Sequence, residues 1–159
     1  MVEIIDSHDQ VLLLMGKERA EAQKLPHRWV LAAFYDRAGR LWLRRVVPQT
    51  PGVPAYLDFS VRAHVLSGEA RESTVERLLE KELGISGTQP LLRAVFPLLE
   101  GEDRRHFSLF IAGRRGMQAL PTASGGLFLD KDELAGLAEH FPDLLHPSLL
   151  WCIREAWLG

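Results

Sequence analysis

The chain has 159 residues, of which 47% are hydrophobic, with a formal net charge of −2 and a single cysteine, Cys152. A chain of this length buries a core without disulfide staples, and one cysteine excludes an intramolecular disulfide. The small net charge excludes a strong overall attraction to nucleic acid or to an anionic membrane. No apolar stretch reaches the roughly 20 residues of a membrane span, and no signal-type segment opens the chain. We expect one soluble, cytoplasmic domain over residues 1–159, without nucleic-acid or membrane partners.

The first third of the chain predicts two hairpins separated by a short helix. The expected strands are Val2–Ile5, Val11–Met15, Trp29–Tyr35 and Leu41–Val47. Each pair of strands flanks a polar turn, Asp-Ser-His-Asp in the first hairpin and Asp-Arg-Ala-Gly-Arg in the second. Between the hairpins, Lys17–Lys24 is charged and alanine-rich, which predicts a short helix that ends before Pro26.

The rest of the chain predicts a loop rich in proline, further strands and three helices. Pro48 to Pro54 carries three prolines and one glycine, which predicts an ordered loop over the mouth of a pocket. The expected strands are Tyr56–Val61, Leu91–Leu99, His106–Ala112 and Leu127–Leu129, with a basic and glycine-rich loop over Gly113–Gly126. The helices are expected to begin near Glu72, Asp130 and Pro147, the last one reaching Leu158. Hairpins interrupted by amphipathic helices are typical of a layered α+β domain.

The helix that Gly84 ends is unusually acidic. Its apolar residues at helical spacing are Val75, Leu78, Leu79 and Leu83. Its glutamates, with the one just before it, are Glu69, Glu72, Glu76, Glu80 and Glu82. Carboxylate oxygens are the ligands that Mg²⁺ prefers, so this segment is a candidate metal site. The alternative is a solvated helix face on which the glutamates pair with Arg77 and Lys81.

The spacing resembles the Nudix box, whose pattern is Gly, five residues, Glu, seven residues, then Arg-Glu-apolar-x-Glu-Glu-x-Gly-apolar. The matching positions are Glu69, Arg77, Leu79, Glu82, Gly84 and Ile85. The chain is therefore identified as a member of the Nudix superfamily (MutT-like). The resemblance implies an α/β/α sandwich around a mixed β-sheet, and hydrolysis of a diphosphate by water that Mg²⁺ or Mn²⁺ activates.

Three positions depart from the box. Ala63 stands at the first glycine, Leu78 replaces the glutamate after the arginine, and Lys81 replaces the first member of the Glu-Glu pair. In the family, the two replaced carboxylates and the one matched by Glu82 hold the metals. A lysine beside the site weakens a dinuclear metal centre by charge alone. We expect Glu82 to remain the principal ligand, assisted by Glu69 or Glu80.

The chain also resembles the isopentenyl-diphosphate-isomerase-like branch of the superfamily. The resemblance lies in Leu-Pro-His-Arg-Trp-Val at 25–30, Asp-Arg-x-Gly-x-Leu at 36–41 and Leu-Arg-Arg at 43–45. Isomerases of that branch have a catalytic cysteine shortly before a metal-binding histidine. His64 matches the histidine, but Arg62 occupies the cysteine position.

The acid pair that isomerases carry in a later strand is also missing. The acidic residues nearest to that place are Glu100, Glu102 and Asp103, which predict a turn. His27 is either a ligand or, more commonly for a histidine at the start of a strand, a hydrogen-bonding residue. Isomerisation of isopentenyl diphosphate is therefore the least favoured function.

Two other functions are preferred. The first is Mg²⁺-dependent hydrolysis of a nucleoside-diphosphate or prenyl-diphosphate type of substrate, with catalysis by Glu82 and Glu69. The second is a catalytically inactive module that binds a diphosphate or nucleotide. The residues expected to bind substrate are Arg44, Arg45, Arg62, His64 and Lys81. Arg44 and Arg45 are adjacent, so on a strand they point to opposite faces. The expected partner is a small-molecule diphosphate, and a homodimer is left open.

Overall fold

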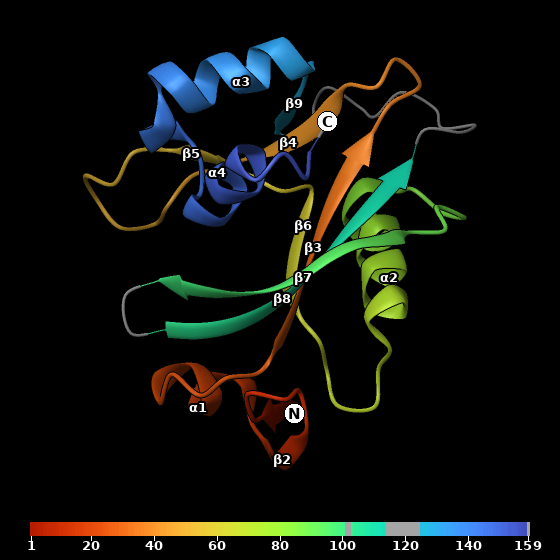
Figure 1. The fold of residues 1–159 in the computed structure, drawn as a ribbon, viewed down its shortest axis with the longest axis vertical. Coiled ribbons are helices and arrows are strands. Elements are labelled where there is room, and N and C mark those ends of the chain that lie inside the picture. Colours follow the sequence, from red (N-terminus) through yellow and green to blue (C-terminus); the bar gives the residue numbers. More distant parts are fainter. Residues whose placement is uncertain (101–102, 114–124, 159) are drawn as a thin grey trace.

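The computed structural model describes residues 1–100, 103–113 and 125–158, with only the strand backbone at 97–100 and 103–105 (Figure 1). The predicted loop over Gly113–Gly126 therefore lies largely outside the described residues, as do residues 101 and 102 of the turn predicted over 100–105. The strands are β1 (Val2–Ile5), β2 (Val11–Met15), β3 (Arg28–Tyr35), β4 (Leu41–Val46), β5 (Tyr56–Asp58), β6 (Val61–His64), β7 (Leu91–Glu100), β8 (Asp103–Gly113) and β9 (Gly126–Leu129). The helices are α1 (Lys17–Ala22), α2 (Arg71–Leu83), α3 (Lys131–His140), the short 3-10 helix η2 (Pro142–Leu144) and α4 (Pro147–Arg154).

A seven-stranded mixed sheet forms the centre of the protein. Five strands follow the order β5-β4-β3-β8-β7, while β6 pairs with β3 and β9 pairs with β4. β3 and β8 are parallel over Arg28–Tyr35, and the other pairs in this sheet are antiparallel. β1 and β2 form a separate two-stranded sheet. The predicted α+β fold with a mixed sheet is confirmed.

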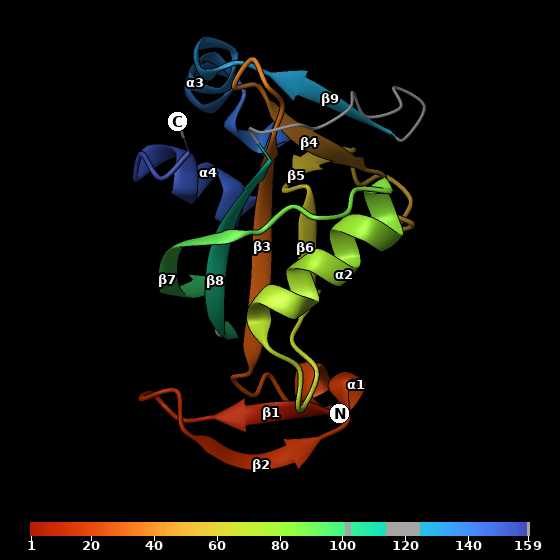
Figure 2. The same cartoon turned by 90° about the vertical axis from the view of Figure 1, so that its right-hand side faces the viewer.

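Helices cover both faces of the large sheet, as Figure 2 shows for α2 on one side and α4 on the other. β3 explains this arrangement because its residues are apolar on both faces. Trp29, Leu31 and Tyr35 belong to the cluster beneath α3 and α4, whereas Val30 and Phe34 belong to the cluster beneath α2. A strand buried on both faces is expected to be a continuous apolar run. The result is the predicted α/β/α sandwich.

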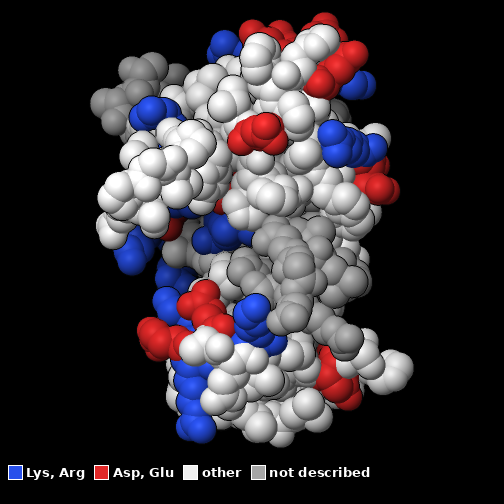
Figure 3. Space-filling view, turned by 90° about the vertical axis from the view of Figure 1, so that its left-hand side faces the viewer, with Lys and Arg blue, Asp and Glu red and all other residues white. Residues whose placement is uncertain are grey.

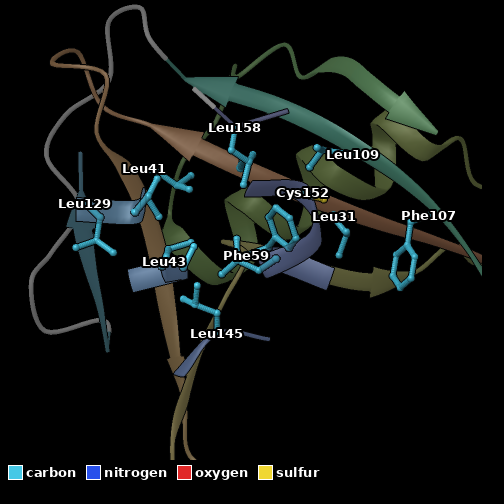
Figure 4. Packing of buried hydrophobic residues seen from close by; sticks show 14 of the residues in the cluster. Leu31, Leu41, Leu43, Phe59, Phe107, Leu109, Leu129, Leu145, Cys152 and Leu158 are labelled. Atoms are coloured by element: carbon cyan, nitrogen blue, oxygen red, sulfur yellow. The ribbon is translucent and has the colours of Figure 1, made fainter. Parts of the chain in front are cut away.

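The larger apolar cluster lies on the side of α3 and α4. Figure 4 shows side chains from β3, β4, β8, β9 and α4 packed together in it. Phe59, Phe107, Leu109 and Cys152 are fully buried there. None of the helices in the described parts of the chain is long and apolar enough to cross a membrane.

Three predicted boundaries were wrong. β8 begins at Asp103 rather than at His106, since residues 103–105 continue the pairing with β7. The strand expected over Tyr56–Val61 is divided into β5 and β6, because the Asp58 carboxylate accepts a hydrogen bond from the Phe59 N–H at 2.7 Å and the chain changes strand partner there. The last helix ends at Arg154 rather than at Leu158. Ala156 has φ of 57°, a left-handed conformation that a continuing helix does not accommodate.

Candidate active site

Helix α2 presents one apolar face to the sheet and ends at a glycine. Val75, Leu78 and Leu79 are buried against β3, β6 and β8. Gly84 adopts φ of 66°, and its N–H and that of Ile85 donate to the carbonyls of Glu80 and Leu79. This left-handed cap requires glycine and turns Ile85 back into the core. Leu78, at a box carboxylate position, is 7% exposed and packs in the core.

Glu82 and Arg44 face each other between the last turn of α2 and strand β4. Glu82 Oε2 lies 3.9 Å from Arg44 Nη1, and about a third of each side chain is exposed. This separation is longer than a hydrogen bond, so the pair is a loose ion pair at the protein surface. Arg44 Nε is buried and has no hydrogen-bond partner within the described residues. The structure thus brings together two of the predicted site residues, with Lys81 exposed one residue away.

Glu80 lies on the other side of the helix from Glu82. Two residues along an α-helix differ by about 200° around its axis, and Glu80 is exposed on the face opposite the buried leucines. This corrects the prediction that Glu80 assists Glu82 in holding one metal ion. Arg45 likewise differs from Arg44, since it alternates to the other face of β4 and is exposed.

Glu69 serves as the partner of Arg77 rather than of Glu82. Arg77 Nε and Nη2 donate to the two oxygens of Glu69 at 2.8 and 3.2 Å. These hydrogen bonds hold the pKa of Glu69 below its ordinary value of 4.5. Glu69 precedes the first turn of α2, and Arg71 to Glu82 spans about 16 Å along a helix. Glu69 and Glu82 therefore cannot share one metal ion, which corrects the predicted catalytic and metal role of Glu69.

Comparison with known proteins decides the family. The protein named uncharacterized Nudix hydrolase SCO1686 of Streptomyces coelicolor is 31% identical over 168 aligned residues, which cover 100% of this chain and 90% of the relative. The chain belongs to the Nudix hydrolase family. Uncharacterized Nudix hydrolase all7351 of Nostoc is 33% identical over 86 residues, 54% of this chain and 51% of that relative. No family model matches the chain.

Solved structures of the Nudix fold superpose on the whole sandwich. DR0079 from Deinococcus radiodurans has a TM-score of 0.71 at 22% identity and covers 97% of both chains. The MutT protein from Methanosarcina mazei has a TM-score of 0.63 at 14% identity, covering 83% of this chain and 92% of that one. Both likenesses show the fold. The predicted membership of the Nudix superfamily is confirmed.

His64 lies away from the Nudix helix end that carries Glu82. It pairs with Trp29 at the start of β3, near α1, whereas α2 ends beside β4 at the far end of the sheet (Figure 2). His27 Nδ1 donates to the Leu25 carbonyl at 2.8 Å, so in neutral His27 Nε2 accepts from His64 Nδ1 at 2.8 Å. His64 Nε2 lies 3.2 Å from Glu21 Oε1. His64 therefore belongs to a partly buried histidine pair rather than to a site shared with Arg44.

Arg62, at the position of the isomerase cysteine, belongs to a buried network. Its guanidinium donates to both oxygens of Asp58 at 2.7 and 2.9 Å, lies 3.0 Å from His146 Nδ1 and donates to Ser148 Oγ. This network occupies Nε and Nη2 and leaves Nη1 without a hydrogen-bond partner among the described residues, so Arg62 has a structural role here and its role as a substrate ligand stays a prediction. Cys152 does not replace the isomerase cysteine, because burial raises the pKa of its thiol to about 12.

A cleft of about 480 Å³ lies beside this network. Its walls are Val53, Pro54, Tyr56, Pro142, Asp143, Leu145, His146, Pro147 and Leu150. Val53 and Pro54 come from the loop that the prolines predicted, so the end of this loop lines a cleft. The cleft is walled mainly by apolar side chains, and the carboxylate of Asp143 is the one charged group among them.

Charged side chains of both signs lie near one another on the face drawn in Figure 3, which presents no extended area of positive charge alone.

Among the residues described, no group of three or more His, Cys, Asp or Glu side chains is arranged to hold a metal ion. Glu82 by itself fits a metal site in which a single protein carboxylate is one of the ligands. Mg²⁺ commonly keeps several waters and binds through one or two carboxylates together with substrate phosphates.

Proposed function

We propose that this Nudix-family protein binds the diphosphate of a small-molecule substrate, of nucleoside-diphosphate or prenyl-diphosphate type, and hydrolyses it slowly with Mg²⁺ or Mn²⁺. The observation that carries the proposal is the approach of Glu82 to Arg44 at 3.9 Å, at the end of the helix that matches the Nudix box. This pair places an accessible carboxylate beside a guanidinium whose Nε is buried without a partner in the described structure. A cation and a phosphate can be bound side by side there.

Each side chain at this site has a proposed role. Arg44 donates to phosphate oxygens, because a guanidinium binds phosphate through charge-assisted hydrogen bonds. Lys81 adds a second positive charge that neutralises the diphosphate. Glu82 would hold the metal ion together with the substrate. When bound, the ion polarises the phosphoryl group and supplies an activated water.

Slow turnover follows from the two replaced carboxylates. Leu78 offers no oxygen, and its side chain is buried in the core beneath α2. Lys81 is exposed one residue from Glu82 and repels a divalent cation there, although solvent screens the repulsion. A single protein carboxylate then has to bind the ion against this repulsion, and metal affinity falls.

Calorimetric titration of Mg²⁺ and Mn²⁺ tests the proposal, with ADP or a prenyl diphosphate present, alongside an assay for released phosphate. Glu82→Gln is the test variant, and Glu80→Gln is the matched control on the solvent face of the same helix. We expect Glu82→Gln to abolish both metal binding and turnover, and Glu80→Gln to retain both. Equal behaviour of the two variants would refute the role of Glu82.

A second candidate function is favoured by the burial of Leu78 and the presence of Lys81. A module that binds a diphosphate without metal needs positive charge and no metal ligand, and Arg44 with Lys81 meets that need. Titration of ADP and prenyl diphosphate in the presence of EDTA separates the two functions. Binding that persists in EDTA, with no phosphate released in excess Mg²⁺, supports the binding module. Binding that requires Mg²⁺ supports the hydrolase.

A further inference from the structure

Strands β3 and β4 pair with each other over a short stretch only. The paired residues are Phe34 with Trp42 and Tyr35 with Leu41. Farther along the sheet, β3 takes β6 as its neighbour and β4 takes β5. β3 and β4 therefore separate at one point of the sheet, and the chain between β5 and β6 crosses from β4 to β3 there.

Ser60, which lies in that crossing segment, joins the two strands where they separate. Its hydroxyl accepts a hydrogen bond from the Phe34 N–H at 3.1 Å and donates to the Trp42 carbonyl at 2.6 Å. A serine hydroxyl has one donor and two acceptor lone pairs, so it can make both bonds at once. Ser60 is also fully buried, and a hydrogen bond in the interior is stronger than one in water. The hydroxyl thus links β3 to β4 at the end of their direct pairing.

The two side chains of the proposed diphosphate site are carried by the elements that this hydroxyl links. Glu82 lies on α2, which packs on β3, β6 and β8 (Figure 2). Arg44 lies on β4, two residues after Trp42, and it pairs with Asp58, two residues before Ser60. The distance between Glu82 and Arg44 therefore depends on how β4 is held relative to β3 and β6.

The polar contacts of Arg44 do not fix its position by themselves. Its Nε is buried without a hydrogen-bond partner in the described parts of the chain. Its Nη1 lies 3.9 Å from Glu82 Oε2, beyond hydrogen-bond distance. Neither group anchors the guanidinium, so the placement of the β4 backbone decides where Arg44 lies.

We propose that Ser60 is a positioning residue of the diphosphate site. Its two hydrogen bonds hold β4, and with it Arg44, in place relative to the part of the sheet on which α2 carries Glu82. This inference rests on the proposed function, in which Arg44 binds phosphate and Glu82 binds the metal ion. Binding groups have to be held to within about 0.5 Å by supporting hydrogen bonds and packing. Ser60 supplies that support from a position that touches neither substrate nor metal.

NMR spectroscopy of the arginine side chains tests the proposal without any ligand. The Nε–H signal of Arg44 is identified by its disappearance in Arg44→Lys. We expect Ser60→Ala to shift this signal and to speed its exchange with water, because β4 is then held less firmly. Ser108→Ala is the matched control, since Ser108 is equally buried but its Oγ has no hydrogen-bond partner within the described residues. This control is expected to leave the Arg44 signal unchanged.

A second variant, Ser60→Cys, keeps the test valid if Ser60→Ala does not fold. Cysteine has nearly the size of serine, and its thiol is a weaker donor and a weaker acceptor. The Arg44 signal of Ser60→Cys is expected to lie between those of the unaltered chain and of Ser60→Ala. The proposal is overturned by an Arg44 signal that stays the same in the Ser60 variants, or by an equal shift in Ser108→Ala.

Calorimetric titration of ADP with Mg²⁺ separates this proposal from the proposed function. At a temperature where all variants are folded, we expect Ser60→Ala to raise the dissociation constant about tenfold and Ser108→Ala to leave it unchanged. A purely structural role would lower the melting temperature of Ser60→Ala and leave the dissociation constant as it is, which contradicts positioning. If the unaltered chain binds neither ADP nor a prenyl diphosphate, the proposed function fails, and the NMR signal still decides whether Ser60 positions Arg44.

Discussion

Asp58 and Arg62 form a bidentate ion pair in the interior of the protein, with Nε–Oδ2 and Nη2–Oδ1 distances of 2.7 and 2.9 Å. Only 2% of the Asp58 side chain and 11% of the Arg62 side chain are exposed. The same guanidinium donates to Ser148 at the start of α4. The pair therefore ties the bend between β5 and β6 to the last helix.

Removing the Asp58 charge should strongly destabilise the fold. Asp58→Asn leaves a buried guanidinium without its counter-charge, and breaking such a pair costs about 3–5 kcal/mol. Urea unfolding at neutral pH measures the loss. Asp36→Asn is the control, because its partner Arg40 is 52% exposed and an exposed pair contributes only about 0.2–1 kcal/mol. Similar losses in both variants would show that the Asp58 pair is not the stabilising feature.

The contribution of Asp58 should disappear in acid. Burial opposes ionisation of this carboxyl, but the hydrogen bonds and charge of Arg62 outweigh burial and hold the pKa of Asp58 below its ordinary value of 3.8. A pKa lowered by folding stabilises the protein above the unfolded value and ceases to do so as the pH falls through the folded value. The difference in unfolding free energy between the unaltered chain and Asp58→Asn is thus expected to shrink below about pH 4. A difference that stays constant down to pH 2 contradicts this assignment.

Two glycines on helices should respond to alanine with opposite signs. Gly84 has φ of +66°, and no atom lies within 4 Å of an added Cβ, so strain alone decides the effect. Gly84→Ala should cost about 1–2 kcal/mol. Gly136 lies inside α3 with equal space around it, and Gly136→Ala should add about 0.5–1 kcal/mol. Thermal unfolding of both variants measures the two changes in stability. A stabilising Gly84→Ala would refute the left-handed cap.

Restoring the box carboxylates should create a metal site at a cost in stability. Leu78→Glu buries a carboxyl where Leu78 now packs, and this is expected to lower stability by about 2–4 kcal/mol without metal. Combined with Lys81→Glu, it places three carboxylates near the end of α2. Because a ligand that binds the folded state stabilises it, Mg²⁺ should raise the melting temperature of the double variant far more than that of the unaltered chain. Lys81→Gln alone is the control, and an absent Mg²⁺ effect in the double variant contradicts the reconstruction.

The thiol of Cys152 should be unreactive in the folded protein. Its side chain is fully buried, and burial raises the pKa of the thiol to about 12, so the reactive thiolate is scarce near neutral pH. A thiol reagent such as DTNB is expected to react only after denaturant is added. Rapid labelling in native buffer would contradict the burial of this thiol.

The sequence by itself determined the elements whose signals are local. Apolar runs and turn residues predicted both N-terminal hairpins, and helical spacing with Gly84 predicted the span of α2 to within one residue of its observed start. The spacing from Glu69 to Ile85 also predicted the Nudix family and its sandwich fold, which the structural likeness and the Streptomyces relative confirm. These features depend on residues that are close together in the sequence, so sequence patterns and spacing record them directly.

Only the tertiary structure decided how the charged residues are used. The sequence predicted Glu82 as the principal ligand with Glu69 or Glu80 assisting, but Glu80 lies on the opposite side of the helix from Glu82, and Arg77 donates to both oxygens of Glu69. Arg62 was predicted to bind phosphate, yet its partner Ser148 lies 86 residues away, and His64 meets His27 across 37 residues. Contacts between residues so far apart in the sequence arise from strand pairing and from the packing of helices on the sheet. No local sequence pattern encodes these contacts, because the residues between the two partners do not fix the distance between them until the chain has folded.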